Sequence, residues 1–375
     1  MRKDERIGRL AENLIKNSVR LEKGEQIYIE AIGMSTLPLM QELVRAATEA
    51  GGVPFYYFND QSLQKAFIEQ ASVAQMKAQA EIHKKLMASS QAYIGVRGND
   101  DLFQMSAVVE DKMNDYQKYY WNPVHSEIRV PQTKWCVLRY PNAAFAAMSK
   151  MSLADFEDFY FDACLVDYVK MGKAMKPLKK LMDKTKKVRI KAPGTDLEFS
   201  IAGLKAVVCD GDKNIPDGEV YTAPVKNSIN GVVQFNTETS YLGNVFSNIR
   251  LVFKDGRIVE GCSQTNDDKF QKILDMDEGS RYMGEFALGV NPYVTKPMLD
   301  ILFDEKICGS FHMAIGNSYE DETNNGNKSA IHWDLVQMQD KEHGGGEIWF
   351  DDVLIRKDGR FVLSELEGLN PDKLK

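Results

Sequence analysis

The chain has 375 residues, of which 43% are hydrophobic and 27% are charged, and its formal net charge is −7. This length is typical of two domains, and the composition excludes a mainly disordered, collagen-like or coiled-coil protein. The negative charge argues against a large phosphate-binding face, so we expect no nucleic-acid partner. The opening residues lack an apolar signal-peptide core, and no apolar run approaches the length of a membrane helix. We therefore expect a cytoplasmic protein without a membrane partner.

Helical and strand patterns alternate through the first half of the chain. Strands that are separated by helix-length segments imply crossover connections and a largely parallel sheet. The sequence therefore predicts an α/β domain over residues 1–184, closed by a long helical stretch over about 152–184. In order, its earlier elements are a helix from Ile7, a strand over 26–31, a helix over 37–50, a strand over 53–58, helices to about residue 86, and strands over 92–97 and 135–140.

The pattern changes after residue 184. Apolar and polar residues alternate on both sides of Pro193-Gly194, which is typical of a β-hairpin. The turn dipeptides Asp255-Gly256 and Asp358-Gly359 indicate further hairpins. We therefore predict a β-rich α+β domain over residues 185–375. Its other short strands are expected at 231–235, 248–254, 257–260, 347–350 and 353–356.

Several familiar catalytic signatures are absent from the sequence. It contains neither GxxxxGK[ST] nor a GxGxxG after a strand, and neither GxSxG nor HExxH. These absences argue against kinases, dinucleotide-dependent dehydrogenases, α/β-hydrolases and zincin proteases. The five cysteines are scattered and form no CxxC pair, so neither a zinc knuckle nor a dithiol redox motif is available.

Possible metal ligands are concentrated in the second domain. His332 and Asp334 are two residues apart in AIHWDLV, and in a strand both side chains lie on one face. Burying a carboxylate in such an apolar segment is unfavourable unless it is paired or bound to a cation. A divalent metal would satisfy the carboxylate and the imidazole together.

Other acids and histidines in this half could join such a site. Taken alone, each also fits a hydrogen-bonded core histidine or a surface charge, and His343 in KEHGGGE is typical of an exposed loop. Together with the His332 and Asp334 pair they favour a metal centre. They are Glu219 in NIPDGEVYTAP, Glu285 in MGEFALG, Asp304-Glu305, His312 in FHMAIG and Tyr319.

Four motifs in this order resemble the metallo-aminopeptidases of the aminopeptidase T, aminopeptidase S and PepS type, the thermophilic metalloprotease family. They are IPDGEVYTAP, DEGSRYMGEFALGVN, LFDEKICGSFHMAIGNSY and NKSAIHWDL. The motifs cover about residues 215–335, whereas the first half is similar in pattern only. The resemblance implies cytoplasmic, homodimeric exopeptidases that hold two divalent metal ions and release N-terminal residues from peptides.

The resemblance also implies a set of site residues. Tyr319 falls at the family's tyrosine position, as a ligand or a close hydrogen-bond donor. Glu305 corresponds to an acid near the same centre. Two more residues separate it from His312 here than in some members of the family. The implied metal ligands are Glu219, Glu285, His312, His332 and Asp334, with Glu305 and Tyr319 beside them.

Mixed carboxylate and imidazole donors favour zinc, cobalt or manganese over calcium. Our hypothesis is that two such ions hold a bridging water, lower its pKa and polarise the scissile carbonyl. Glu219 or Glu285 would transfer the proton to the leaving amine, and Tyr319 could donate to the developing oxyanion. Two alternatives stay open: a non-catalytic metal- or peptide-binding protein, and another metal-dependent amidohydrolase.

Overall fold

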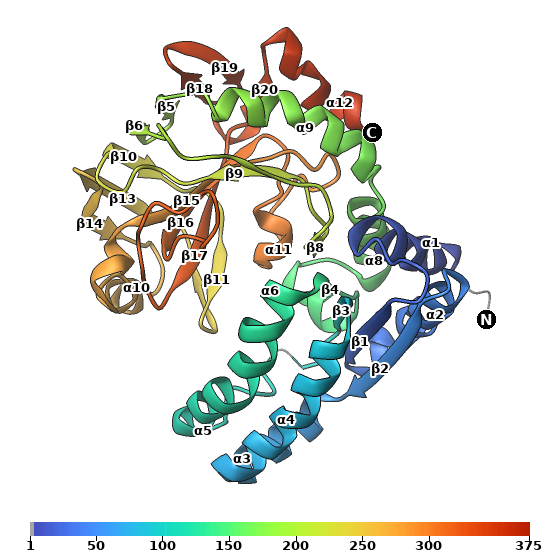
Figure 1. Ribbon diagram of the computed structural model, residues 1–375. Coiled ribbons are helices and arrows are strands. Elements are labelled where there is room, and N and C mark those ends of the chain that lie inside the picture. Colours follow the sequence, from blue (N-terminus) through green and yellow to red (C-terminus); the bar gives the residue numbers. More distant parts are fainter. Residues whose placement is uncertain (1–3, 102) are drawn as a thin grey trace. The chain divides into compact units, whose positions relative to one another are not determined.

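The computed structural model describes residues 4–101 and 103–375, and the chain divides into two compact units (Figure 1). The first unit runs to Leu165 and also contains Gly211–Ile215, and the second comprises Val166–Asp210 and Pro216–Lys375. The sequence placed the division after residue 184, so the two divisions differ mainly in one helix. None of the helices in the described residues is long and apolar enough to cross a membrane.

The long helical stretch predicted over 152–184 is in fact two helices. Helix α8 (Leu153–Cys164) ends before Asp167, whose side chain accepts a hydrogen bond from the Lys170 backbone and caps the next helix, α9 (Tyr168–Met182). Because α9 begins at its own N-cap, it is a separate helix from α8. Helix α8 belongs to the first unit and α9 to the second. Helix α9 packs against β7 (Val207–Cys209) and β9 (Glu219–Thr222) of the second unit.

The first unit contains a parallel sheet with the strand order β2–β1–β3–β4–β8. Nearly every residue of β1 is buried, as expected for a strand covered on both faces. The predicted α/β domain with a parallel sheet is confirmed. Its elements are α1 (Glu5–Asn13), η1 (Leu14–Ser18), β1 (Gln26–Ile32), η2 (Met34–Thr36), α2 (Leu37–Glu49), β2 (Val53–Asn59), α3 (Gln61–Gln70), α4 (Val73–Ser89), β3 (Ala92–Arg97), α5 (Glu110–Tyr116), η3 (Gln117–Arg129), α6 (Val130–Gln132), β4 (Lys134–Arg139), α7 (Ala143–Met148), α8 and β8 (Asn214–Ile215).

A buried ion pair joins two central strands of this sheet. Nη2 of Arg97, at the end of β3, lies 2.8 Å from Oε2 of Glu30 on β1. The hydroxyl of Tyr93 donates to the same oxygen at 2.5 Å. Burial raises the pKa of Glu30, but the charges of Arg97 and His125 and the hydrogen bonds from Tyr93 and Arg97 together outweigh it and lower that pKa to about 2.

We expect this pair to make folding stability pH-dependent. A carboxyl with a depressed folded pKa stabilises the protein above its unfolded pKa of 4.5, and this stability is lost as the pH falls towards 2. Its contribution at neutral pH is on the order of 3 kcal/mol. Urea unfolding of the native protein and of Glu30→Gln between pH 6 and pH 3.5 measures it. The stability difference should shrink as the pH falls, and a constant difference would contradict the assignment.

The second unit consists mainly of antiparallel sheets. A large sheet has the order β14–β13–β10–β6–β5–β18–β19–β20, and a smaller one has the order β17–β16–β15–β9–β7. The predicted hairpin around Pro193-Gly194 is confirmed as β5–β6. Further elements are β5 (Lys187–Ala192), β6 (Thr195–Ser200), β10 (Asn230–Gln234), β11 (Thr239–Tyr241), β12 (Asn244–Phe246), β13 (Arg250–Lys254), β14 (Arg257–Cys262), α10 (Asp267–Leu274), η4 (Glu278–Arg281), β15 (Met283–Gly289), α11 (Ile301–Asp304), β16 (Ser310–Gly316), β17 (His332–Met338), η5 (Lys341–His343), β18 (Glu347–Phe350), β19 (Val353–Lys357), β20 (Arg360–Phe361), η6 (Ser364–Leu369) and α12 (Pro371–Leu374).

The core of the second unit lies between these two sheets. The Phe286 ring on β15 packs on Phe199 of β6 with 5.0 Å between centroids, and Phe311 on β16 packs near Phe235 at 6.3 Å. Because side chains alternate along a strand, the residues next to Phe286 and Phe311 point to the other face of the smaller sheet. That other face carries the candidate ligands.

Candidate metal centre

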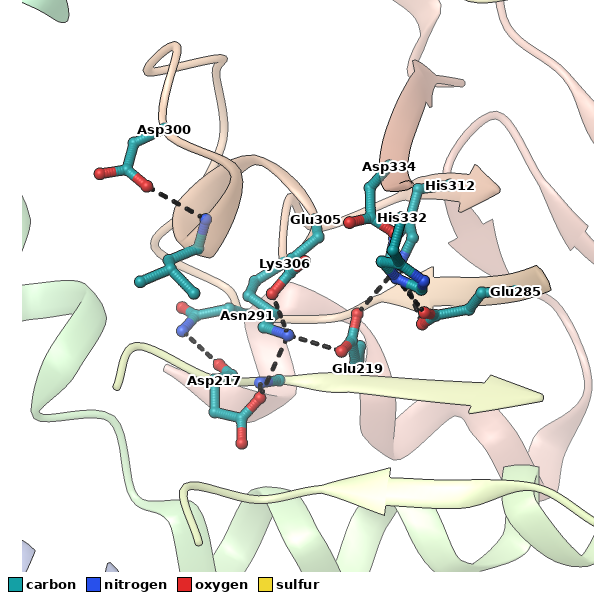
Figure 2. Close-up of polar contacts among 12 residues, drawn as sticks. Asp217, Glu219, Glu285, Asn291, Asp300, Glu305, Lys306, His312, His332 and Asp334 are labelled. Atoms are coloured by element: carbon teal, nitrogen blue, oxygen red, sulfur yellow. Dashed lines mark hydrogen bonds and ion pairs between the residues drawn. The ribbon is translucent and has the colours of Figure 1, made fainter. Parts of the chain in front are cut away.

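The candidate ligands come from four strands of the smaller sheet (Figure 2). In each strand they alternate with large apolar residues that face the core, such as Phe286, Phe311 and Trp333. One face of the sheet is therefore packed and the other is polar. The five residues are Glu219 at the start of β9, Glu285 on β15, His312 on β16, and His332 and Asp334 on β17.

A β-bulge aims Glu285 into this group. The pairing of β15 with β16 shifts register between Met283 and Glu285. Gly284 lies inside the shift, where an added Cβ would come 2.2 Å from the Asn317 carbonyl oxygen. Only glycine fits so close an approach, and bulges re-aim the side chains that follow them.

Small residues surround the charged ones on the same face. Residues that lie directly opposite each other in an antiparallel pair share a face. Ala314 lies opposite both Glu285 and Asp334, and Gly316 lies opposite His332. This alternation of small and charged residues leaves room between the charged side chains.

The His312 imidazole is at the centre of the cluster. Its Nε2 lies 3.2 Å from Glu219 Oε2, 3.4 Å from Glu285 Oε1 and 4.0 Å from Asp334 Oδ1. The histidine is fully buried, and the three acids are at most 6% exposed. Strands that are distant in sequence thus bring three carboxylates around one imidazole.

The His332 imidazole approaches the same acids from the edge. Its Nε2 lies 3.2 Å from Glu285 Oε2 and 3.5 Å from Asp334 Oδ1. Its Nδ1 is 2.7 Å from the carbonyl oxygen of Asn317, to which it donates. This hydrogen bond leaves Nε2 as the nitrogen that can bind a metal, which is the usual arrangement of metal-binding histidines.

Five of these buried side-chain atoms have no hydrogen-bond partner. Buried polar atoms nearly always have one, so such a cluster is unusual. Ligands that bind one ion at ~2.1 Å lie about 3–3.5 Å apart, close to the spacing around the two imidazoles. The donor set therefore fits a divalent cation. The atoms are Glu219 Oε2, Glu285 Oε2, His312 Nε2, His332 Nε2 and Asp334 Oδ1.

The charges of the cluster influence one another strongly. Burial lowers the pKa of His312, but Glu219 and Glu285 outweigh it and raise that pKa to about 9. Burial likewise opposes a charged His332, yet Asp334 raises the pKa of this imidazole well above its usual value. The carboxylates thus hold positive charge at both imidazoles. A metal ion would displace these protons, so we expect its binding to release protons.

Two residues of the site were missed by the sequence analysis, Lys306 and Asp217. The Lys306 ammonium lies 2.5 Å from Glu219 Oε1, 2.7 Å from Glu305 Oε1 and 3.5 Å from Asp217 Oδ1 (Figure 2). Lys306 and Asp217 are each 1% exposed. The sequence carries a signal for each, since Lys306 stands next to Glu305 in the motif LFDEKICGSFHMAIGNSY and Asp217 stands two residues before Glu219.

Glu305 lies beside the cluster. One of its carboxylate oxygens is within 4.8 Å of ligand atoms of His312 and Asp334. Burial raises the pKa of Glu305 to about 8, although the charge of Lys306 opposes this. The neighbouring acid Asp304 faces elsewhere, because it accepts a hydrogen bond from the Met298 backbone at 2.6 Å.

Tyr319 lies next to His332, with 5.0 Å between the ring centroids. Its other ring neighbour is Tyr221 at 5.3 Å, whose hydroxyl donates to Asp321 at 2.8 Å. The charge of Glu285 raises the pKa of Tyr319 well above its usual value. In the metal-free site the phenol therefore keeps its proton and can donate a hydrogen bond.

His343 is not part of the cluster. It is in η5, where its Nδ1 lies 2.8 Å from Asp340 Oδ2 in an exposed pair. This agrees with the exposed loop that the sequence indicates. Asp277, which precedes η4, accepts from the Ser280 backbone and caps that segment.

A buried carboxylate and imidazole cluster on one sheet face, in a chain of one α/β unit and one mainly antiparallel unit, is a candidate divalent metal site. Residues 3–361 match the thermophilic metalloprotease family (M29), so the chain belongs to this family. The predicted family and the predicted enzyme class, a metallo-aminopeptidase, are therefore confirmed.

The chain is similar to several curated proteins of this type. It is 37% identical over 141 residues to aminopeptidase AmpS of Bacillus subtilis, a match that covers 34% of each chain. It is 24% identical to aminopeptidase 2 of Geobacillus stearothermophilus, over 86% of each chain. With aminopeptidase T of Thermus aquaticus the identity is also 24%, over 88% of this chain and 92% of the relative.

Solved structures confirm the fold class. Wild-type AmpT from Thermus thermophilus superposes with a TM-score of 0.82 at 22% identity, over 96% of this chain and 99% of the other. A 2,5-dihydroxypyridine dioxygenase from Pseudomonas putida KT2440 superposes with a TM-score of 0.61 at 12% identity, over 96% of this chain and 98% of that one. At these identities the likeness shows the fold alone.

Proposed function

We propose that this protein is a metal-dependent aminopeptidase, which releases N-terminal residues from peptides with a water molecule activated at a divalent metal centre. The observation that carries the proposal is the set of unpartnered carboxylate and imidazole atoms on one sheet face. It lies in a chain whose curated relatives are named aminopeptidases. The two supports are independent, because one is geometric and the other is sequence similarity.

The residues of the cluster divide into ligands and proton carriers. Glu285 faces both imidazoles, one with each oxygen, which suits a ligand. A divalent ion bound there supplies a Lewis acid that polarises a carbonyl and lowers the pKa of water. Glu219 or Glu285 stays our prediction for the group that moves the proton to the leaving amine. Tyr319, with its proton retained, would donate to the oxyanion that develops on the carbonyl.

An acidic site also favours a free N-terminus. The carboxylates of Glu219, Glu285 and Asp334 lie in the cluster, and the carboxyl group of Glu305 lies beside it. An α-ammonium group is attracted to such a region, whereas an acetylated terminus carries no charge. Peptides with a free N-terminus are therefore the proposed substrates.

A matched pair of substrates tests the proposal. We expect the metal-loaded protein to hydrolyse leucyl-p-nitroanilide, and to cleave its N-acetylated counterpart at least about a hundredfold more slowly, a difference of ~3 kcal/mol. Equal cleavage of both would instead support a general metal-dependent amidohydrolase. Binding of unblocked peptides without any turnover would support the non-catalytic alternative.

Further features that the resemblance implies remain predictions. They are a pair of metal ions, zinc, cobalt or manganese as the metal, a homodimer, and a cytoplasmic location.

A further inference from the structure

A polar cavity lies in the first unit, at the carboxyl ends of β1 and β3. Its volume is about 200 Å³, and Ile32 at the end of β1, Arg97 at the end of β3 and Asn99 just beyond it line the cavity. In the order β2–β1–β3–β4–β8, the strand that follows β1 lies on one side of this pair and the strand that follows β3 lies on the other. The topological switch point of the sheet is therefore between β1 and β3. Open α/β sheets bind their ligands in the crevice at such a point.

The strands present an unusually polar face to this cavity. Because side chains alternate along a strand, Tyr93, Gly95 and Arg97 share one face of β3. An added Cβ at Gly95 would come 2.8 Å from the Tyr93 hydroxyl, so the glycine leaves space for polar groups there. Glu30 of β1 occupies this region and accepts hydrogen bonds from both Tyr93 and Arg97.

The helix η3 forms another wall of the cavity with Tyr120, Trp121 and His125. It has the wide winding of a π-helix, and at its end the Val130 N–H donates to the His125 carbonyl, five residues earlier. Such winding is rare and is frequent at functional sites. The Trp121 ring stacks on the His125 ring with 5.3 Å between centroids, which gives this wall an aromatic surface.

Several polar groups of the walls are already held by neighbours. The Tyr120 hydroxyl is 2.7 Å from Nδ1 of His83, and Gln64 Nε2 donates to the Tyr116 hydroxyl at 2.9 Å. Burial lowers the pKa of His125 to about 4, so this ring is neutral at neutral pH. These groups shape the cavity and add no charge to it.

Three buried atoms of other lining residues have no hydrogen-bond partner among the described residues. They are Nη1 of Arg97, Oδ1 of Asn99 and Oε1 of Gln61. Glu30 holds only Nη2 of the guanidinium, at 2.8 Å. Buried polar atoms nearly always have a partner, so a ligand is expected to supply one for each of these atoms. Such a ligand needs an acceptor for the guanidinium and N–H donors for the two amide oxygens.

From this arrangement we infer that the cavity binds a free α-amino acid. The carboxylate of the amino acid accepts from Arg97 Nη1 in a charge-assisted hydrogen bond. Its ammonium group has three N–H donors, which Asn99 Oδ1 and Gln61 Oε1 accept. Ile32 and Trp121 offer apolar surface to an aliphatic side chain.

The size of the cavity supports a ligand of this class. Pockets for drug-sized molecules have volumes of about 300–1,000 Å³, so a cavity of about 200 Å³ excludes a nucleotide or a long peptide. The site goes beyond the proposed aminopeptidase activity, because it belongs to a different unit from the metal centre.

Calorimetric titration of chelator-treated native protein with L-leucine and with the smaller L-alanine tests the inference. The chelator removes metal ions, which bind amino acids themselves. We expect at least one of the two to bind at one site per chain, with a dissociation constant below about 1 mM. For leucine, 4-methylpentanoate lacks the ammonium group and 3-methylbutylamine lacks the carboxylate. Each should bind at least about tenfold more weakly than the amino acid.

Variants locate the site. Asn99→Leu and Gln61→Leu each remove one acceptor at a half-buried position, and each should weaken amino-acid binding at least about tenfold. Gln70→Leu is the matched control, because Gln70 is exposed at the other end of the same helix, α3, as Gln61. His332→Ala changes the metal centre and should bind the amino acid as the native protein does.

Each other outcome has a definite meaning. The inference is overturned if neither amino acid binds at up to about 10 mM, or if 4-methylpentanoate binds as tightly as leucine. Unchanged affinity in both leucine variants, or loss of binding in His332→Ala, would also overturn it. All of these results leave the proposed aminopeptidase intact. Amino-acid binding that Asn99→Leu weakens, in a protein that hydrolyses no unblocked peptide, would support the inference and refute the proposed function.

Discussion

Removal of divalent metal should abolish the release of leucine from leucyl-p-nitroanilide. We expect the rate to fall at least about a thousandfold after dialysis against a chelator, which corresponds to ~4 kcal/mol of transition-state stabilisation. The reason is that without a cation the carboxylates of Glu219 and Glu285 and the two imidazoles only face one another, at 3.2–3.4 Å. They then offer neither a Lewis acid nor an activated water.

When zinc is added back to the metal-free protein, its apparent affinity should depend on pH. The carboxylates raise the pKa of His312 to about 9, so its imidazole is protonated at neutral pH in the metal-free protein. A metal must displace that proton, so the apparent affinity for zinc should increase as the pH rises from 6 to 8. Zinc or cobalt should restore turnover, and a magnesium control should restore far less. Full activity in protein shown by elemental analysis to be metal-free would refute the proposed function.

Replacing His332 by alanine is expected to have the second largest effect. The side chain contributes one metal-facing nitrogen and one hydrogen bond to Asn317. We expect kcat/KM to fall by about 10²–10³-fold, or ~3–4 kcal/mol. Metal affinity should fall with it, which equilibrium dialysis measures separately.

The same variant separates a catalytic from a structural metal site. The His332 side chain is 25% exposed and lies at the edge of the cluster, so its loss should move the melting temperature by only a few degrees. His343→Ala is the matched control, because that histidine pairs with the nearby Asp340 and lies outside the cluster. It should retain native kinetics and native metal content. Unfolding of His332→Ala at ambient temperature would favour a structural role for the metal.

The architecture explains why a metal centre forms on this sheet. The large apolar residues of β15, β16 and β17 pack towards the core, and Phe286 and Phe311 anchor that face. The opposite face can then carry acids and imidazoles at fixed register, since β15 and β16 have neighbours on both sides and the edge strand β17 pairs with β16 along its whole length. A site built on paired strands is more rigid than one built on loops.

Much of the first unit was predictable from sequence. Strand-like segments such as QIYIEA that are separated by helix-length segments allow few arrangements other than a parallel sheet. The error over 152–184 arose because two helices in succession look like one when only three residues separate them. The cap at Asp167 that divides them was a local signal that the sequence analysis did not use.

The identity of the candidate ligands was also accessible from the chain itself. His332 and Asp334 follow the two-residue period of a strand, and their apolar neighbours indicate that both are buried. The motifs around Glu219, Glu285 and His312 suggested partners for them. The local sequence around each residue thus indicated a possible metal ligand. The resemblance to the family then grouped these residues into one predicted metal site.

What only the tertiary structure decided is how these residues meet. Strand pairing between segments far apart in the chain sets which side chains share a face, and a shift of one residue would turn each of them away. The bulge at Gly284 and the ammonium of Lys306 are results of such pairing and packing. The sequence therefore determined the chemistry that is available. The register of β9, β15, β16 and β17 determined where the ligand side chains meet, because distances across a sheet depend on contacts that no local pattern encodes.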